Sequence, residues 1–324
     1  EWLVAELLAC TEGNLERAAA HLRGGGLVAV PTETVYGLAA DATNGKAVAA
    51  IYETKGRPSF NPLIVHIAGI DMGQELAEFD PLSKRLAEVF WPGPLTLVLP
   101  LKPGSRIASL VTAGLKTVGL RCPKGPAQEL IRLLGSPLAA PSANSSGRIS
   151  PTTAQAVDTD LGGKIPIILD GGPSPVGVES TIVKVEDGVV RLLRPGGVAV
   201  EDIEKVTGLA VQRADKRAAI EAPGMLASHY APVAPVRLDA VRVLPDEALR
   251  AFGPRRGCGA EQAKKMLNLS PTGDLNEAAA NLFSYLAALD ESRPRMIAVE
   301  PIPERGLGEA IIDQLKRAAA PRVT

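Results

Sequence analysis

A Lys-Gly-Arg-Pro segment combines two cations that could bind a phosphate chain. Lys55 and Arg57 stand two positions apart, and Gly56 and Pro58 form a turn that ends any preceding helix. Lysine binds phosphate as a point charge, whereas arginine donates two parallel hydrogen bonds. The same two cations would also complement the dipole of a helix C-terminus. The segment by itself therefore leaves both interpretations open.

Two further polar segments could contact a small ligand. Ser142 and Asn144 alternate in a turn after the strand-like run 137–140, so a hydroxyl and an amide would project from one side. Ser180 begins another strand, and Arg194 ends the next one before Pro-Gly-Gly, where it could clamp a phosphate. The alternatives are an Asx or capping turn at Ser142–Asn144 and a surface cation at Arg194.

The histidines and the absence of several known motifs limit the kinds of catalytic or nucleotide-binding site that the sequence can form. His66 ends an apolar run, so it is either a hydrogen-bonded core residue or part of a pocket. His229 lies between prolines, which favours a role in gating or ligand contact. There is no GxxxxGK[ST] segment, no HExxH and no Ser-His-Asp order, and 306–308 is only a fragment of a dinucleotide fingerprint. Any nucleotide site must therefore be built from side chains and ordinary loops.

The elements that must position these residues alternate along the first two thirds of the chain. Apolar runs predict strands at 27–30, 63–67, 95–101, 117–121, 165–169, 180–185 and 189–193. Periodic patterns predict helices at 47–55, 81–90, 127–134 and 201–208. The predicted helix at 47–55 lies between the Thr32-Glu33-Thr34 turn and the Lys-Gly-Arg-Pro segment, and residues 1–22 read as one amphipathic helix. This order predicts an α/β fold with a partly antiparallel sheet and polar loops at the strand ends.

The amino-acid composition and the predicted secondary structure change near residue 210. Residues 211–235 are charged, rich in alanine and proline, and poor in strand signal. A smaller α/β unit follows, with strands at 248–253 and 296–300, a helix at 274–289 capped by Asp274, and a closing helix at 308–320. The predicted organisation is a domain at 1–210, a linker at 211–235 and a second domain at 236–324.

Composition excludes several classes of protein. The 324 residues carry a net charge of −1 and only 3% aromatic residues, which disfavours a base-stacking nucleic-acid platform. Three separated cysteines exclude a disulfide scaffold, and the absence of a signal peptide or a bilayer-length apolar run predicts a cytoplasmic protein. Residues 89–157 include seven basic residues and only one acidic residue, which suggests an anion-binding surface there.

Seven ordered segments together resemble one family. They read PTETVYGL, KGRPxxNPLIVH, WPGPLTLVL, GLRCP, APSAN, DGGPSPVGVESTI and LLRPG. This order resembles the Sua5/YrdC family in its long, Sua5-type form. The resemblance covers about residues 15–208, APGMLASHYAP resembles the interdomain linker of that form, and 236–324 resembles its Sua5 domain. The fold it implies is α/β, with a twisted mixed-sheet YrdC-like catalytic domain followed by a smaller Rossmann-like domain.

The resemblance also implies an activity. Members of the family are threonylcarbamoyl-AMP synthases, nucleotidyltransferases that convert L-threonine, bicarbonate and ATP into threonylcarbamoyl-AMP and pyrophosphate, with Mg²⁺. A downstream transferase complex then modifies the adenosine beside the anticodon of tRNAs that read ANN codons. A direct contact with tRNA or double-stranded RNA is a further expectation, and no membrane contact is expected.

The family's site residues are carried over by position. Those expected to act in catalysis and at the ATP are Lys55, Arg57, Ser142 and Asn144, with Asn61, Arg194 and His229 as further ATP ligands. Those expected around L-threonine are Thr32, His66, Thr117, Arg121 and Ser180. The Mg²⁺ is expected to be held mainly by the nucleotide phosphates, without protein side chains. The basic stretch 89–157 would surround the nucleotide.

Two other classes of function remain open from the sequence. One is a non-catalytic RNA-binding module, which a net charge of −1 weakens because backbone binding needs a positive field. The other is a transferase that uses carbamoyl phosphate, because this domain also occurs in hydrogenase-maturation proteins. No zinc-finger or acylphosphatase-like segment accompanies it in this chain, which disfavours that interpretation.

Overall fold

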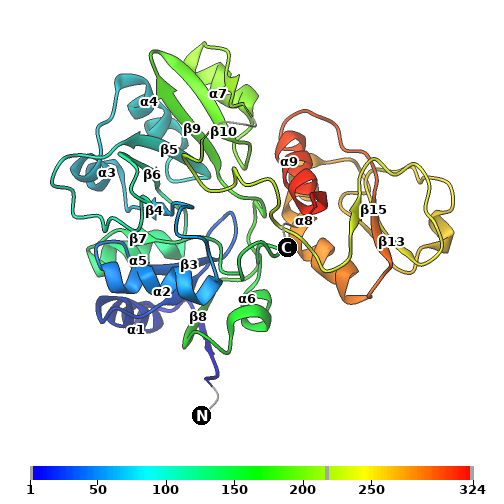
Figure 1. Cartoon of the computed structure of the whole chain (residues 1–324), viewed down its shortest axis with the longest axis horizontal. Coiled ribbons are helices and arrows are strands. Elements are labelled where there is room, and N and C mark those ends of the chain that lie inside the picture. Colours follow the sequence, from blue (N-terminus) through cyan, green and yellow to red (C-terminus); the bar gives the residue numbers. More distant parts are fainter. Residues whose placement is uncertain (1–2, 216–218, 322–324) are drawn as a thin grey trace.

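The computed structural model describes residues 3–215 and 219–321, and most of the strands in this part form one large sheet (Figure 1). Its order is β1-β8-β2-β3-β7-β4-β6-β5-β9-β10-β11. The strands are β1 Glu6–Ala9, β2 Val28–Val30, β3 Gly37–Asp41, β4 Ile64–His66, β5 Leu95–Pro100, β6 Thr117–Arg121, β7 Leu138–Ala139, β8 Ile167–Asp170, β9 Thr181–Glu186, β10 Val189–Arg194 and β11 Gln212–Arg213.

Pairing within this sheet is mixed. The pairs β1–β8, β2–β8, β4–β6 and β5–β9 are parallel, whereas β2–β3, β3–β7, β5–β6 and β9–β10 are antiparallel. The mixed α/β architecture expected from the sequence is therefore confirmed. Strands far apart in the sequence become neighbours, so the loops after β2, β4, β6 and β7 approach one another.

Helices cover both faces of the large sheet. They are α1 Glu12–Arg23, α2 Gly45–Lys55, α3 Ile70–Leu76, α4 Pro81–Phe90, α5 Pro126–Leu134, α6 Ala154–Leu161 and α7 Val200–Thr207. Val28 and Val30 belong to the apolar cluster that contains α1 and α5, whereas Ala29 between them belongs to the cluster that contains α2 and α6. This alternation places one core on each face of the sheet.

The chain near its N-terminus differs from the prediction of a single helix. Residues Glu6–Ala9 form β1, which pairs in parallel with β8 at the edge of the sheet. The helix begins only at Glu12, where the Thr11 hydroxyl caps the backbone amide of Asn14 at 3.3 Å. Pairing with β8 supplies backbone hydrogen bonds that the local pattern does not reveal. The prediction for residues 1 and 2 lies outside the described residues.

The helix expected between the Thr32-Glu33-Thr34 turn and the Lys-Gly-Arg-Pro segment is confirmed as α2, but an unpredicted strand precedes it. The turn leads into β3, which pairs back onto β2 with Val30 opposite Gly37. Helix α2 starts only at Gly45, capped by Asn44. Because β3 is buried on both faces, its residues Gly37–Ala40 lack the alternation by which a strand is recognised.

A second, smaller sheet follows the linker. Its strands β12 Val236–Arg237, β13 Glu247–Ala251, β14 Met266–Asn268 and β15 Met296–Val299 are all parallel, in the order β12-β15-β13-β14. Helices α8 Leu275–Glu291 and α9 Gly308–Ala319 pack on it, and Asp274 caps α8 as expected. The Rossmann-like character of this unit is confirmed, whereas the exact limits at 210 and 235 stay a prediction.

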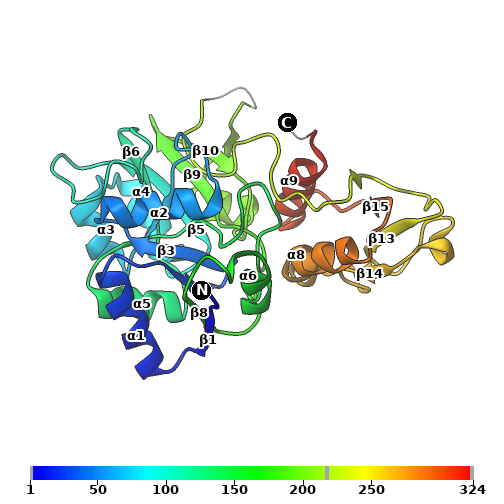
Figure 2. The same ribbon diagram turned by 60° about the horizontal axis from the view of Figure 1, so that its bottom comes forward.

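The two units meet along α8, α9 and the linker (Figure 2). Tyr230 enters the apolar cluster of the second unit, with its ring centroid 5.4 Å from that of Phe283. Gly177 of the first unit lies so close to α8 that an added Cβ would stand 2.6 Å from the Cα of Ala280. In the described part of the chain, every helix is too short or too polar to cross a lipid bilayer.

Candidate active site

A pocket lies where the ends of several strands of the large sheet meet the linker. Its cavity volume is about 30 Å³, which is room for about two water molecules. Eight of the twelve predicted site residues line it, and Lys55, Asn61, Thr117 and Asn144 do not. The lining residues are Thr32, Thr34, Val35, Gly37, Arg57, Ile64, His66, Arg121, Ala140, Pro141, Ser142, Glu179, Ser180, Arg194, Pro223, Gly224, His229 and Tyr230.

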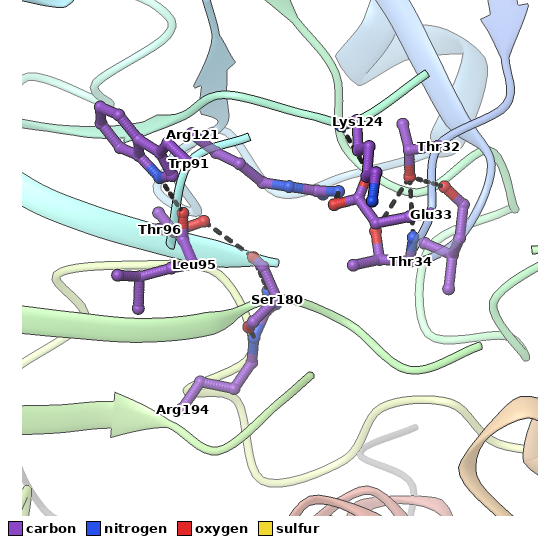
Figure 3. A network of polar contacts seen from close by, with 11 residues as sticks. Thr32, Glu33, Thr34, Trp91, Leu95, Thr96, Arg121, Lys124, Ser180 and Arg194 are labelled. Atoms are coloured by element: carbon purple, nitrogen blue, oxygen red, sulfur yellow. Dashed lines mark hydrogen bonds and ion pairs between the residues drawn. The ribbon is translucent and has the colours of Figure 1, made fainter. Parts of the chain in front are cut away.

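A buried ion pair forms one wall of the pocket (Figure 3). The Arg121 guanidinium binds the Glu33 carboxylate, and both side chains are more than nine-tenths buried. The backbone amide of Lys124 donates to the second Glu33 oxygen at 2.8 Å. Arg121 Nε is buried without a hydrogen-bond partner among the described residues. This N–H therefore keeps an unused hydrogen-bonding capacity beside the pocket.

The turn after β2 is held rigid by its own hydroxyls. Thr32 Oγ1 donates to the Val35 carbonyl at 2.6 Å and lies 2.9 Å from Thr34 Oγ1. Because Thr32 uses its proton on the backbone, Thr34 is the donor in the hydroxyl pair. Both side chains are buried and line the pocket beside Arg121.

The opposite wall joins β5, β9 and β10. Arg194 Nε donates to the Ser180 carbonyl at 3.0 Å, and one of its terminal nitrogens donates to Ser180 Oγ at 3.1 Å. Ser180 Oγ also lies 2.8 Å from Thr96 Oγ1 on β5, as Figure 3 shows. Arg194 is thus a buried cation of the pocket, so its interpretation as a surface cation is wrong.

Lys55 connects the Lys-Gly-Arg-Pro segment to the Ser142–Asn144 turn through hydrogen bonds. Its ammonium group donates to the backbone carbonyls of Ser142 and Asn144. Burial, followed by the charge of Arg57, lowers the pKa of Lys55 to about 7, although Glu179 and Asp160 oppose this effect. Lys55 also ends α2, with Gly56 as a left-handed C-cap. The segment therefore ends a helix, and a role of Lys55 in binding phosphate stays a prediction.

Arg57 reaches the pocket through a fixed guanidinium. Its Nε donates to the Asn61 carbonyl at 3.2 Å, and one terminal nitrogen donates to the Pro62 carbonyl at 2.6 Å. Burial lowers the pKa of Arg57 to about 10, so the group stays charged at neutral pH. The remaining donors can bind an anion in the pocket.

Both pocket histidines are neutral at physiological pH. Burial, and then the charge of Arg121, lowers the pKa of His66 to about 3. Burial and the charges of Arg57 and Lys55 lower the pKa of His229 to about 3 as well. The His229 Nδ1 accepts a hydrogen bond from the Tyr230 amide at 3.0 Å, so its proton is on Nε2. The two rings therefore act as hydrogen-bond partners and not as cations.

Besides Lys55, three predicted residues lie outside the lining of the pocket. Asn61 supports Arg57 through its carbonyl, and Asn144 donates its side-chain amide to the carbonyls of Ser145 and Arg148. Thr117 lines a separate small cavity beside Thr96, so the structure does not bring it to the predicted threonine site. Thr117 and Arg121 stand four positions apart on β6, so they share a face of the strand and are separated along its length.

The basic stretch 89–157, predicted to surround the nucleotide, contributes little to the lining of this pocket. Of its seven cations, Arg121 alone is among the lining residues. Lys102 donates to the Gln74 carbonyl, and Arg106 and Arg132 pair with carboxylates at the surface. The other cations of the pocket, Arg57 and Arg194, come from outside that stretch. Nearness in sequence does not imply nearness in a mixed sheet.

Sequence reasoning missed four residues of the site. Glu179 and Tyr230 line the pocket directly beside the predicted Ser180 and His229, and Thr34 stands in the same turn as Thr32. Glu33 lies behind Arg121 as its counter-ion. All four residues belong to segments that the sequence analysis had recognised as polar. The pattern therefore identified the segments but not these individual side chains. Residues 3–215 and 219–321 contain no group of three or more His, Cys, Asp or Glu that could hold a metal ion alone.

Two family models match the chain. Residues 20–196 match the Sua5/YciO/YrdC model, described as telomere recombination, and residues 198–320 match the model for the threonylcarbamoyl-AMP synthase C-terminal domain. The first model alone covers more than half of the chain. The fold and the pocket thus define a two-domain α/β protein with a polar ligand site, and the chain belongs to the Sua5/YrdC family, in its long, Sua5-type form.

Relatives match over nearly the full length. The threonylcarbamoyl-AMP synthase of Bacillus subtilis is 43% identical over 99% of this chain and 97% of its own length. That of Pyrococcus abyssi is 42% identical over 96% of both. The crystal structure of P. abyssi Sua5 complexed with L-threonine superimposes with a TM-score of 0.85 at 39% identity, covering 98% of this chain and 96% of that one.

Proposed function

We propose that this protein is a threonylcarbamoyl-AMP synthase, which converts L-threonine, bicarbonate and ATP into threonylcarbamoyl-AMP and pyrophosphate. The observation that carries the proposal is the full-length match to proteins of that name, among them one whose structure holds L-threonine. The product would supply a transferase complex that modifies the adenosine beside the anticodon of tRNAs reading ANN codons. The transferase, any RNA contact and a cytoplasmic location stay predictions.

One end of the pocket suits the amino acid. The free Nε of Arg121 is a donor for the threonine carboxylate, and Glu33 keeps that guanidinium in place. Thr32, Thr34, His66 and Ser180 supply hydroxyls and a neutral imidazole around it. Since a buried donor without a partner costs free energy, a carboxylate ligand at Arg121 would relieve that cost.

The other end suits the nucleotide. Arg57 and Arg194 are buried cations in the pocket wall, and Lys55 holds the Ser142–Asn144 turn through two carbonyls. Phosphoryl chemistry needs mainly positioning and charge neutralisation, which fixed guanidinium groups provide. Mg²⁺, when bound, would neutralise further charge on the phosphates.

The reaction then follows from the chemistry of the three substrates. The threonine ammonium loses a proton, and its nitrogen forms a bond to the bicarbonate carbon while water leaves. One oxygen of the resulting carbamate attacks the α-phosphorus, and the bond from that phosphorus to the bridging oxygen breaks, which releases pyrophosphate. This is a nucleotidyl transfer. Because the carbamate hydrolyses easily, a site that excludes water is an advantage.

A direct assay tests the proposed function. Pure protein is incubated with ATP, bicarbonate, Mg²⁺ and labelled L-threonine, and pyrophosphate and labelled adenylate are measured. Release of pyrophosphate that depends on both threonine and bicarbonate supports the proposal. Release without threonine, or no release at all, would contradict it and favour a carbamoyl-phosphate transferase or an RNA-binding module.

The linker closes the pocket in this structure. Pro223, Gly224, His229 and Tyr230 line it, and a cavity of about 30 Å³ is far too small for ATP. We therefore infer that the linker acts as a lid that opens to admit substrates. A second P. abyssi Sua5 structure superimposes on this chain with a TM-score of 0.87, and in that protein an adjacent histidine and tyrosine are both replaced by alanine. In this chain the single adjacent His-Tyr pair is His229–Tyr230, in the linker.

Gly224 offers a test of this lid. It adopts φ +79°, and an added Cβ would overlap the Cδ of Arg194. We expect Gly224→Ala to prevent closure over Arg194 and to lower product yield per ATP consumed about tenfold, since the carbamate would meet water.

The matched control for that variant is Gly188→Ala. Gly188 has φ +72° but open space around its Cα, so this change adds the same backbone strain away from the pocket. Yield is measured as labelled adenylate per pyrophosphate released. Equal yields for the two variants would remove the case for closure at Gly224.

A further inference from the structure

Glu179 is a buried carboxylate that the reaction as derived so far does not use. It precedes β9, is 8% exposed and lines the pocket. Ser150 Oγ donates to its Oε1 at 2.8 Å. Its Oε2 makes no hydrogen bond with any residue that the structure describes. The side chain is therefore held at one oxygen, and the other oxygen keeps its capacity to accept a further bond.

The surroundings of Glu179 are cationic. Its charge raises the pKa of both Lys55 and Arg57, so it lies within electrostatic reach of the two cations assigned to the ATP. It also acts on Tyr230 of the linker. Glu33, the other buried acid near the pocket, is already paired with Arg121. Among the described lining residues, Glu179 is the single carboxylate.

A carboxylate in this place conflicts with binding a bare triphosphate. Its charge would repel the phosphate oxygens that Arg57 and Arg194 attract, and burial in a low-dielectric pocket strengthens that repulsion. A divalent cation between the two anions removes the conflict. Mg²⁺ in nucleotide sites is commonly held by one or two carboxylates together with substrate phosphates and waters.

We propose that Glu179 Oε2 is the protein ligand of the divalent cation that accompanies the nucleoside triphosphate. The proposal rests on the proposed function for the identity of the nucleotide. It replaces the expectation that the nucleotide phosphates hold the metal without protein side chains. The donor set fits, because one carboxylate oxygen is unbonded and the described residues contain no cluster of three acids or histidines that would bind the metal without nucleotide.

Calorimetric titration with ATP and metal alone tests this role, without threonine or bicarbonate. We expect wild-type protein to bind ATP about tenfold more tightly in Mg²⁺ than in EDTA. Glu179→Gln should reduce that ratio to about twofold or less. In EDTA, the variant should bind ATP at least as tightly as wild type, because the repulsion is gone. A role for Glu179 in folding or packing alone predicts the opposite, a loss of ATP affinity in both conditions.

Asp160→Asn is the matched control. Asp160 also raises the pKa of Lys55, but it binds Ser145 outside the pocket. This variant should keep the wild-type metal dependence, and a parallel loss in both variants would show that the effect passes through Lys55. A wild-type metal dependence in Glu179→Gln would overturn the proposal.

A second measurement applies even if Glu179→Gln fails to fold. Wild-type protein labelled with ¹³C at its glutamate carboxyl groups is loaded with Mn²⁺ and ATP, and electron–nuclear double resonance is recorded. A direct carboxylate ligand produces a strong ¹³C coupling to Mn²⁺, and its absence overturns the proposal. Because no adenylate is formed in either experiment, metal binding at Glu179 and failure of the synthase reaction would be seen separately.

Discussion

Replacing Arg57 with alanine is expected to lower kcat/KM for ATP by about 10²–10³-fold, the usual loss when one preorganised donor to a developing charge is removed. Arg57 is buried, charged and held by the carbonyls of Asn61 and Pro62, so its remaining donors are already oriented toward the pocket. Initial rates of pyrophosphate release over a range of ATP concentrations measure the effect.

Two companion variants make this result specific to the guanidinium. Arg57→Lys keeps a positive charge but cannot reach both carbonyls while binding phosphate, so we expect it to restore only part of the activity. Lys46→Ala removes an exposed cation from the same helix, α2, and should leave the rate unchanged. Near wild-type activity in Arg57→Ala would contradict the assignment of Arg57 to the nucleotide.

Glu33→Gln is expected to destabilise the protein by about 3–5 kcal/mol, the range measured when one member of a buried ion pair is removed. The change would leave the Arg121 guanidinium charged, with only 5% of its side chain exposed and no carboxylate beside it. Affinity for L-threonine should fall as well, because Arg121 would no longer be held in place. Urea unfolding and threonine titration measure the two effects.

The exposed pair Arg17–Glu6 provides the control for that prediction. Both side chains are more than half exposed, so Glu6→Gln should change the unfolding free energy by less than about 1 kcal/mol. If Glu33→Gln were as mild as Glu6→Gln, the pair at Arg121 would not be needed for stability. Threonine affinity would then decide whether Glu33 acts on the ligand site alone.

Elements with strong local signals were predictable from the sequence. Helix α4 matches its predicted range, and α8 begins at the Asp274 cap, because capping and periodicity act over a few residues. β1 and β3 were missed for the opposite reason. Their hydrogen bonds go to β8, β2 and β7, which are distant in sequence or lack an alternating pattern.

The candidate site shows the same division. The segments that carry Arg57, Ser142, Ser180 and Arg194 could be recognised because polar residues beside Pro and Gly mark loops at the ends of helices and strands, where sites are usually built. The contacts that each side chain makes could not be predicted from the sequence. In the structure Lys55 donates hydrogen bonds to the backbone carbonyls of Ser142 and Asn144, and Thr117 lines a different cavity.

The amino-acid sequence alone determined the family, the α/β class and most of the segments that line the pocket. Its tertiary structure decided that Glu33 pairs with Arg121, that Glu179 lies near Lys55 and Arg57 with one hydrogen bond from Ser150, and that the linker lines the same pocket. Residue type and short-range periodicity depend on neighbours along the chain. Charge pairing and burial depend on which strands lie side by side, and that is settled only when the whole sheet has formed.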